Sequence, residues 1–62
     1  MTPQKLLIPS DGNILELVQT IKGKELIHEF KFIKSETKEG VLMTITDENL
    51  TKNLNREIFK PI

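Results

Sequence analysis

Residues 24–34 read KELIHEFKFIK, and the conformation of this segment decides the fold of the chain. The segment contains the single histidine and two of the three phenylalanines, interleaved with charges of both signs. This alternation predicts a half-buried β-strand in which His28, Phe30 and Phe32 lie on one face. Such a strand needs antiparallel neighbours, and turn signals on both sides of the segment predict them.

A helix is the alternative for the same segment. Apolar residues also fall at positions i, i+1, i+4 and i+7 counted from Leu26, which is a helical pattern, and Gly40 is placed to follow the end of that helix. The strand is favoured because a helix would leave Phe32 off its apolar stripe. The alternative element order is strand, strand, helix, strand, helix.

The first turn signal is the pair Asp11-Gly12 between two apolar runs. It suits a two-residue type I′ hairpin, in which both central residues need positive φ. The predicted pairs, all on one face, are Ile8 with Leu15 and Leu6 with Leu17. Pro9 then ends the first strand, which is expected at the sheet edge because proline cannot donate to a neighbour.

The second turn signal is Gly23-Lys24, with glycine in the first position of a type II′ turn. On the apolar face it pairs Leu15 with Phe32, Leu17 with Phe30, Gln19 with His28, and Ile21 with Leu26. On the second face it pairs Ile14 with Ile33, Glu16 with Lys31, and Lys22 with Glu25. A one-residue slip would exchange the two faces, so the agreement of two independent turns is the strongest structural signal.

A third turn is predicted at residues 37–40, where Gly40 closes a type I turn with a bulge. It leads into a strand over residues 41–46, in which Val41, Met43 and Ile45 share a face. The three turns together predict a four-stranded antiparallel β-meander.

A helix is expected to follow the meander. Thr46 is a suitable cap, and Asp47 and Glu48 place negative charge in the first turn, where the helix dipole favours it. The apolar stripe is Leu50, Leu54 and Ile58, the last turn holds Arg56 and Lys60, and the helix stops at Pro61. The predicted fold class is therefore α+β, a single domain over residues 1–62 with one C-terminal helix.

Size and composition indicate a small domain that needs additional stabilisation. A chain of 62 residues buries only about 60% of the surface that its unfolded form exposes. Because the chain has no cysteine, disulfides and thiolate zinc sites are excluded, and a metal site would depend on carboxylates. No cofactor is expected, and a second copy or another protein is the expected source of stability.

The charge balance argues against nucleic acid as the main partner. Nine basic and nine acidic residues give a formal net charge of zero, so no overall field concentrates polyanions. The alternative is a small nucleic-acid-binding regulator that gathers lysines on one face of a dimer. Its candidate residues are Lys22, Lys24, Lys31, Lys34 and Lys38.

A membrane location is not expected. The apolar run Leu6-Leu7-Ile8 is shorter than a signal-peptide core of about 7–15 residues or a spanning helix of about 20. The protein is therefore expected in the cytoplasm. The absence of alanine and the preference for lysine are typical of AT-rich genes in low-GC bacteria and their phages.

The residues that carry chemistry do not form a catalytic pattern. His28 has no serine or cysteine nucleophile opposite it, so we interpret it as a core histidine, with a pH-sensitive contact as the functional alternative. Phe30 and Phe32 are interpreted as core residues rather than a stacking platform for bases. The three glycines mark separate turns and cannot form a phosphate-binding loop, and we do not expect an enzyme.

The second face of the predicted sheet carries apolar residues that one helix cannot cover. An apolar patch rimmed by charge is typical of an interaction surface. We therefore expect a non-enzymatic module that self-associates through this face or a sheet edge. It would act by stoichiometric binding, as an accessory or inhibitory protein of the kind that phages encode. Burial is predicted for Ile14, Val18, Ile27, Ile33 and Leu42, and register-setting contacts for Glu16, Lys22, Glu29 and Lys31.

Overall fold

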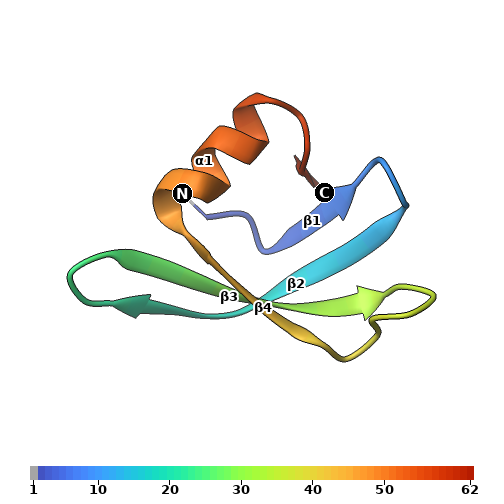
Figure 1. Cartoon of the computed structure of the whole chain (residues 1–62), viewed down its shortest axis with the longest axis horizontal. Coiled ribbons are helices and arrows are strands. Elements are labelled where there is room, and N and C mark those ends of the chain that lie inside the picture. Colours follow the sequence, from blue (N-terminus) through green and yellow to red (C-terminus); the bar gives the residue numbers. More distant parts are fainter. Residues whose placement is uncertain (1) are drawn as a thin grey trace.

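The computed structural model describes residues 2–62 as one antiparallel sheet with a helix packed on it (Figure 1). The strands are β1 (Lys5–Ile8), β2 (Asn13–Lys22), β3 (Leu26–Lys34), β4 (Leu42–Thr46) and β5 (Lys60–Pro61), and the helix is α1 (Asp47–Asn55). Their order across the sheet is β4-β3-β2-β1-β5. The α+β class, the four-stranded meander and the C-terminal helix are confirmed, and residues 26–34 form a strand rather than the alternative helix.

The first hairpin has a longer loop than predicted. Residues 9–12 form the loop, and only Gly12 has a positive φ, of 75°, whereas a type I′ turn needs two such residues. Leu6 consequently pairs with Leu15, so the predicted pairs of Leu6 with Leu17 and of Ile8 with Leu15 are wrong by two positions. The apolar face is unchanged, because side chains alternate with a period of two.

A β-bulge at Val18 divides the pairing of β2 with β3. The pairs of Leu15 with Phe32 and Leu17 with Phe30 are confirmed, but beyond Val18 the register shifts by one residue. Toward the turn the pairs are Gln19 with Glu29, Thr20 with His28, Ile21 with Ile27, and Lys22 with Leu26. The predicted pairs of Gln19 with His28, Ile21 with Leu26 and Lys22 with Glu25 are wrong. The loop contains residues 23–25 rather than two residues, and the bulge absorbs the difference.

The bulge exchanges the faces of the residues near this turn. Ile21, predicted on the face that the helix covers, lies on the second face beside Ile27. Lys22, predicted on the second face, alternates to the helix side. At the other end of the pair a second irregularity sets Ile14 opposite Lys34, so the predicted pair with Ile33 is also wrong.

The turn before β4 contains the predicted glycine bulge. Gly40 has a φ of 87° and donates its amide to the Phe32 carbonyl at 2.8 Å, while the Phe32 amide donates to the Val41 carbonyl at 2.9 Å. Two residues of one strand thus face a single residue of the other. The tight turn spans residues 38–41, one position later than predicted, since the Val41 amide donates to the Lys38 carbonyl.

The helix α1 begins as predicted and ends earlier. Thr46 caps it, because its hydroxyl oxygen accepts a hydrogen bond from the Asn49 amide at 3.2 Å. At the other end the Glu57 amide donates to the Leu54 carbonyl and the Ile58 amide to the Asn53 carbonyl. Glu57 has a φ of 59°, and two such bonds around a left-handed residue form a Schellman motif, which ends the helix.

The chain after the helix forms a fifth strand that the sequence did not predict. The helix predicted to run through Ile58 and Lys60 gives way to an exposed Ile58, a buried Phe59 and the short strand β5, which pairs with β1. β1 is therefore an inner strand and not the predicted edge. Pro61 lies in the edge strand, where proline is tolerated.

Glu57 is the one residue other than glycine with a positive φ among residues 2–62, and this conformation costs roughly 1–2 kcal/mol for an L-residue. Replacing Glu57 by glycine is expected to raise the free energy of unfolding by about 1 kcal/mol, since greater freedom in the unfolded chain offsets part of the gain. Chemical denaturation measures the change. The matched control is Arg56→Gly, because Arg56 has a φ of −88° and gains nothing from glycine. Equal effects of the two variants would contradict this account of the helix end.

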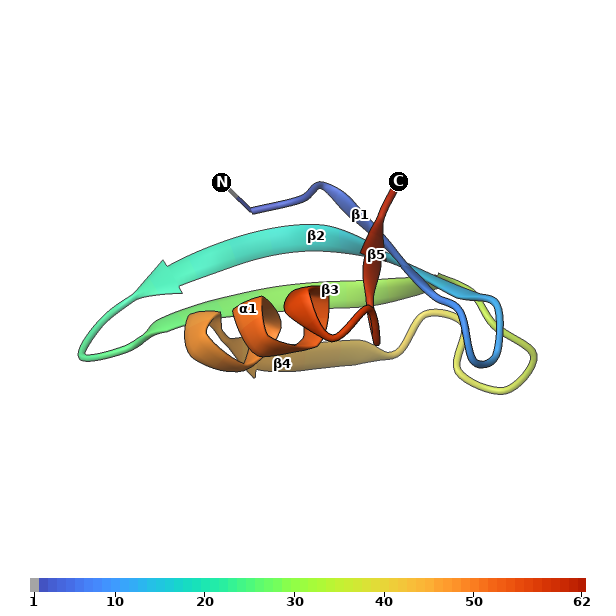
Figure 2. The same ribbon diagram turned by 90° about the horizontal axis from the view of Figure 1, so that it is seen from above.

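The core lies between the sheet and the helix. Its buried apolar residues are Leu6, Leu15, Phe30, Phe32, Leu50 and Phe59. Phe30 and Phe32 are thus core residues, as predicted. In Figure 2, which looks down on the helix side, α1 crosses in front of β3 and β4, and β5 lies against β1. The helix and the Phe59 side chain that follows it cover one face of the sheet.

Candidate interaction surface

The second face of the sheet, opposite the helix, is open to solvent. In Figure 1, α1 lies above β2, β3 and β4, and no helix or strand of residues 2–62 lies below them. Side-chain alternation and two bulges place several apolar residues toward this face. The exposed ones are Val18 (52%), Ile21 (46%), Ile33 (37%) and Leu42 (55%). These side chains contact water although neighbouring apolar residues on the helix side are buried.

Cross-strand pairing sorts the second face into four rows. At one end lie Leu7 and Ile14, which pair with Lys60 and Lys34, and the bulged Ile33 is beside them. The next row contains Lys5, Glu16, Lys31 and Leu42, and the row after it contains Gln19, Glu29 and Thr44. At the end near the β2–β3 turn lie Ile21, Ile27 and Thr46. Apolar residues at both ends therefore flank a central band of charged and polar side chains, and two lysines border the apolar residues at the first end.

The residues predicted to form the apolar part of the interface are divided between these rows. Ile14 and Ile33 lie at one end, Ile27 at the other, and Leu42 on the edge strand. Val18 stands at the bulge between them. Ile21 was missed, because the bulge that brings it to this face leaves no mark in the turn residues from which the register was predicted.

Three of the four residues predicted to set the register lie in the central band. Glu16 is directly opposite Lys31, and Glu29 is opposite Gln19. The Gln19 side-chain amide Nε2 donates to Glu29 Oε1 at 2.9 Å, so this carboxylate already has a polar partner within the chain. The fourth residue, Lys22, alternates to the helix side and takes no part in the band.

The lysines of the nucleic-acid alternative do not gather in one place on the described chain. Lys22 and Lys24 lie at the β2–β3 turn, Lys34 and Lys38 lie near the opposite end of β3, and Lys31 lies between them. The Lys38 Nζ atom is 5.6 Å from the centre of the Phe32 ring, a cation–π contact within the chain. On a single copy, the phosphate groups of a nucleic acid would therefore meet scattered lysines rather than a continuous basic stripe.

His28 is completely buried and links three elements. Its Nε2 atom lies 2.8 Å from Asp47 Oδ1 at the start of α1, and its Nδ1 atom lies 2.9 Å from the Thr20 hydroxyl on β2. Because a carboxylate only accepts, His28 Nε2–H is the donor to Asp47, and the Thr20 hydroxyl is the partner of Nδ1. The contact of Thr20 with His28 was not predicted, because the predicted register placed Gln19 opposite His28.

A hydroxyl, an imidazole and a carboxylate in series also occur in hydrolytic sites, but His28 has no exposed surface. Two hollows of the surface lie at the other end of β2, beside Asp11 and Asn13 and away from Thr20. We therefore assign this series of hydrogen bonds the structural role of holding the start of α1 on the sheet.

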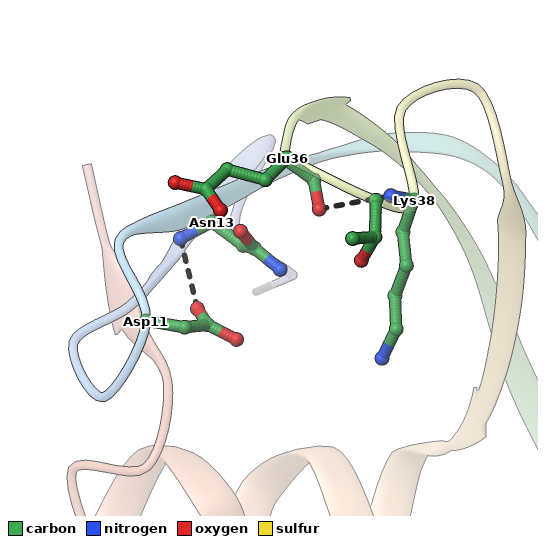
Figure 3. A pocket seen from close by; sticks show the side chains of 6 residues that line it. Asp11, Asn13, Glu36 and Lys38 are labelled. Atoms are coloured by element: carbon green, nitrogen blue, oxygen red, sulfur yellow. Dashed lines mark hydrogen bonds between the residues drawn. The ribbon is translucent and has the colours of Figure 1, made fainter.

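A polar hollow of ≈ 220 Å³ lies between the β1–β2 loop and the β3–β4 loop (Figure 3). Asp11, Asn13, Glu36 and Lys38 line it, and its groups are partly used in the turns. Asp11 Oδ1 accepts from the Asn13 amide at 2.9 Å, and Ser35 Oγ accepts from the Lys38 amide at 3.1 Å. The hollow is open, and its charges have both signs, so it defines no ligand.

Two further features are absent from residues 2–62. No group of three or more histidine, aspartate or glutamate side chains is placed to hold a metal ion. No helix in the same residues combines the length and apolar character needed to cross a membrane.

No protein-family model, curated protein or solved structure matches this chain. The class of the protein therefore follows from its own fold and surface. It is a small α+β protein in which one helix covers one face of an antiparallel sheet and leaves the other face open. Its function has to be argued from that open face.

Proposed function

We propose that this chain is a non-enzymatic interaction module that binds a second copy of itself through the second face of its sheet. It acts by stoichiometric binding, as an accessory or inhibitory protein. The observation that carries the proposal is the exposure of Val18, Ile21, Ile33 and Leu42 on a face that the helix does not reach. A second face laid against them removes apolar area from water, which stabilises the pair by roughly 25 cal/mol per Å².

The small core supports self-association. Six apolar residues of the described range 2–62 are buried, and a domain of this size has little stability in reserve. Association with a partner that binds only the folded state adds stability by mass action. The formal net charge of zero means that two copies approach without overall repulsion.

The edge strand β4 is a second route to self-association. Its five residues are uncharged, whereas the opposite edge ends in Lys60 and Pro61, which hinder strand pairing. The face is preferred because the exposed apolar side chains of β2 and β3 lie there and would stay in water if only the β4 edges paired.

The substitution Ile27→Glu is expected to convert the assembly into a folded monomer. Ile27 lies between Ile21 and Thr46 on the second face and is half-buried, so a carboxylate at this position would lose its water when two faces meet. Light scattering behind a sizing column measures the mass, and circular dichroism checks the fold. Ile21→Glu is a second variant with less effect on folding, since Ile21 is 46% exposed.

The matched control is Ile58→Glu. Ile58 is equally exposed, at 46%, but lies in the turn after α1. This variant is expected to keep the wild-type mass. A wild-type chain that stays monomeric at high concentration would overturn the proposal, and so would an Ile27→Glu variant that keeps the wild-type mass.

A further inference from the structure

We infer that two copies stack their second faces about a two-fold axis that runs along the strands, between β2 and β3. The inference rests on the proposed self-association and adds the arrangement of the two copies. Such an axis lays β2 of one copy over β3 of the other and keeps every residue at its own height along the strands. Two stacked sheets keep their strand directions within about 30° of each other, which agrees with this arrangement.

Two rows of the second face then meet complementary side chains. In the charged row, Glu16 of one copy lies over Lys31 of the other, and the contact occurs twice. In the row near the turn, Ile21 lies over Ile27, also twice. In these two rows apolar side chains meet apolar side chains, and opposite charges meet across the interface.

The same axis covers Leu42, the most exposed apolar residue within the strands. Lys5 on β1 and Leu42 on β4 belong to the same row and lie at equal distances on either side of β2 and β3. The axis therefore places Lys5 of one copy over Leu42 of the other. The aliphatic stem of a lysine can cover an apolar side chain while its charged end stays in water.

An axis across the strands would also stack the two faces, and the bond between Gln19 and Glu29 argues against it. That axis would set Glu16 opposite Gln19 and Lys31 opposite Glu29 of the second copy. The Gln19 side chain already donates to the Glu29 carboxylate at 2.9 Å, so both of these partners are in use within their own chain. That axis would leave the Glu16 carboxylate facing an amide that is in use. The axis along the strands instead pairs Glu16 with Lys31, the two charges of the band that face each other.

The contacts of Glu16 with Lys31 fix the register and the choice of partner more than the affinity. Opposite charges across an interface gain little net free energy after desolvation, whereas like charges in the same place repel and oppose association. A reversal of one charge is therefore expected to weaken the dimer by about 100-fold, because two like-charge contacts form in each pair of copies.

The test uses Glu16→Lys and Lys31→Glu as separate proteins and as an equimolar mixture. Each variant alone brings like charges together at both contacts and is expected to be a monomer. In the mixture, two lysines of one chain meet two glutamates of the other, so a heterodimer is expected to recover the wild-type mass. Since Glu16 and Lys31 are also neighbours within one chain, and mixing leaves that pair unchanged, recovery reports contact between copies alone.

The matched controls are Glu25→Lys and Lys24→Glu, which make the same changes of net charge in the β2–β3 loop and are expected to remain dimers. Loss of the dimer in the controls would show that net charge, and not the row contact, is responsible, and would overturn the inference. A Glu16→Lys variant that stays dimeric, or a mixture that stays monomeric, would also overturn it. If Ile27→Glu still dissociates in either case, the face is correct and the axis is wrong. If Ile27→Glu has no effect, the proposed function fails as well.

Discussion

Replacing His28 by alanine is expected to lower the free energy of unfolding by about 3 kcal/mol, a large share of the stability of so small a domain. The ring is completely buried and hydrogen-bonded at both nitrogens, at 2.9 Å to Thr20 and at 2.8 Å to Asp47. Alanine would leave a cavity beside Phe30 and remove the link between the sheet and the start of α1. Urea denaturation followed by circular dichroism measures the loss.

Single substitutions of the two partners separate the hydrogen bonds from the packing. Thr20→Val removes one bond and is expected to cost about 1 kcal/mol, and Asp47→Ala removes the other together with a favourable charge at the helix start, about 1.5 kcal/mol. The matched control is Glu48→Ala, which removes a neighbouring acid without touching His28 and is expected to cost about 0.5 kcal/mol. A His28→Ala protein within 1 kcal/mol of the wild type would refute the structural role of the ring, since buried large-to-small changes typically cost more.

The substitution Phe59→Ala is expected to lower the free energy of unfolding by about 4 kcal/mol. Phe59 is 7% exposed and packs in the same core cluster as Leu6 and Leu50. It is also the anchor of β5, which makes only two residue pairs with β1. Without the ring we expect β5 to detach before the rest of the sheet unfolds.

Hydrogen exchange tests the release of β5 directly. The Ile62 amide donates to the Lys5 carbonyl at 3.2 Å, and its exchange is expected to accelerate in Phe59→Ala. The neighbouring substitution Ile58→Ala is the control and is expected to cost about 0.5 kcal/mol, because Ile58 is exposed. A Phe59→Ala protein with wild-type stability and unchanged exchange at Ile62 would contradict the anchoring role.

The preferences of individual residues were sufficient to predict most of the fold. The alternation over residues 26–34 identifies the strand, since helical spacing would leave Phe32 off the apolar stripe. Thr46 predicts the start of α1 because a hydroxyl at that position satisfies a free amide of the first turn. The bulge at Gly40 follows from the ability of glycine to adopt positive φ.

The features that the sequence did not predict depend on contacts between distant residues. The helix ends just before Glu57, whose backbone adopts a conformation that favours glycine, so no residue preference marks the position. The burial of Phe59 against the core directs the chain back to β1 and creates β5. The two-residue loop predicted from Gly23 fails because the bulge at Val18 allows a three-residue loop without disturbing the pairs of Leu15 and Leu17.

The location of the candidate site on the second face could be predicted from the sequence, but the arrangement of its apolar and charged residues could not. Alternation alone indicates that β2, β3 and β4 carry apolar residues on a second face. The division of that face into apolar ends and a charged band depends on the register beyond Val18, which also brings Thr20 to His28. The bulge at Val18 shifts the residues of the second face and the residues of the core by the same step. Because the sequence analysis did not predict this bulge, its predictions for the site and for the core near the turn were wrong together.

The bulges in the pairing of β2 with β3 also give the second face a shape. Bulges increase the right-handed twist of a strand pair, and in Figure 1 the long strands cross one another at the centre of the molecule. A sheet twisted in this way curves in opposite senses along its two diagonals, as a saddle does. A flat partner surface would contact only a narrow strip of such a saddle. A second sheet with the same right-handed twist can contact it over a much larger area. In the proposed assembly, the curvature of the second face therefore favours another twisted sheet as the partner, whatever side chains the sheet carries.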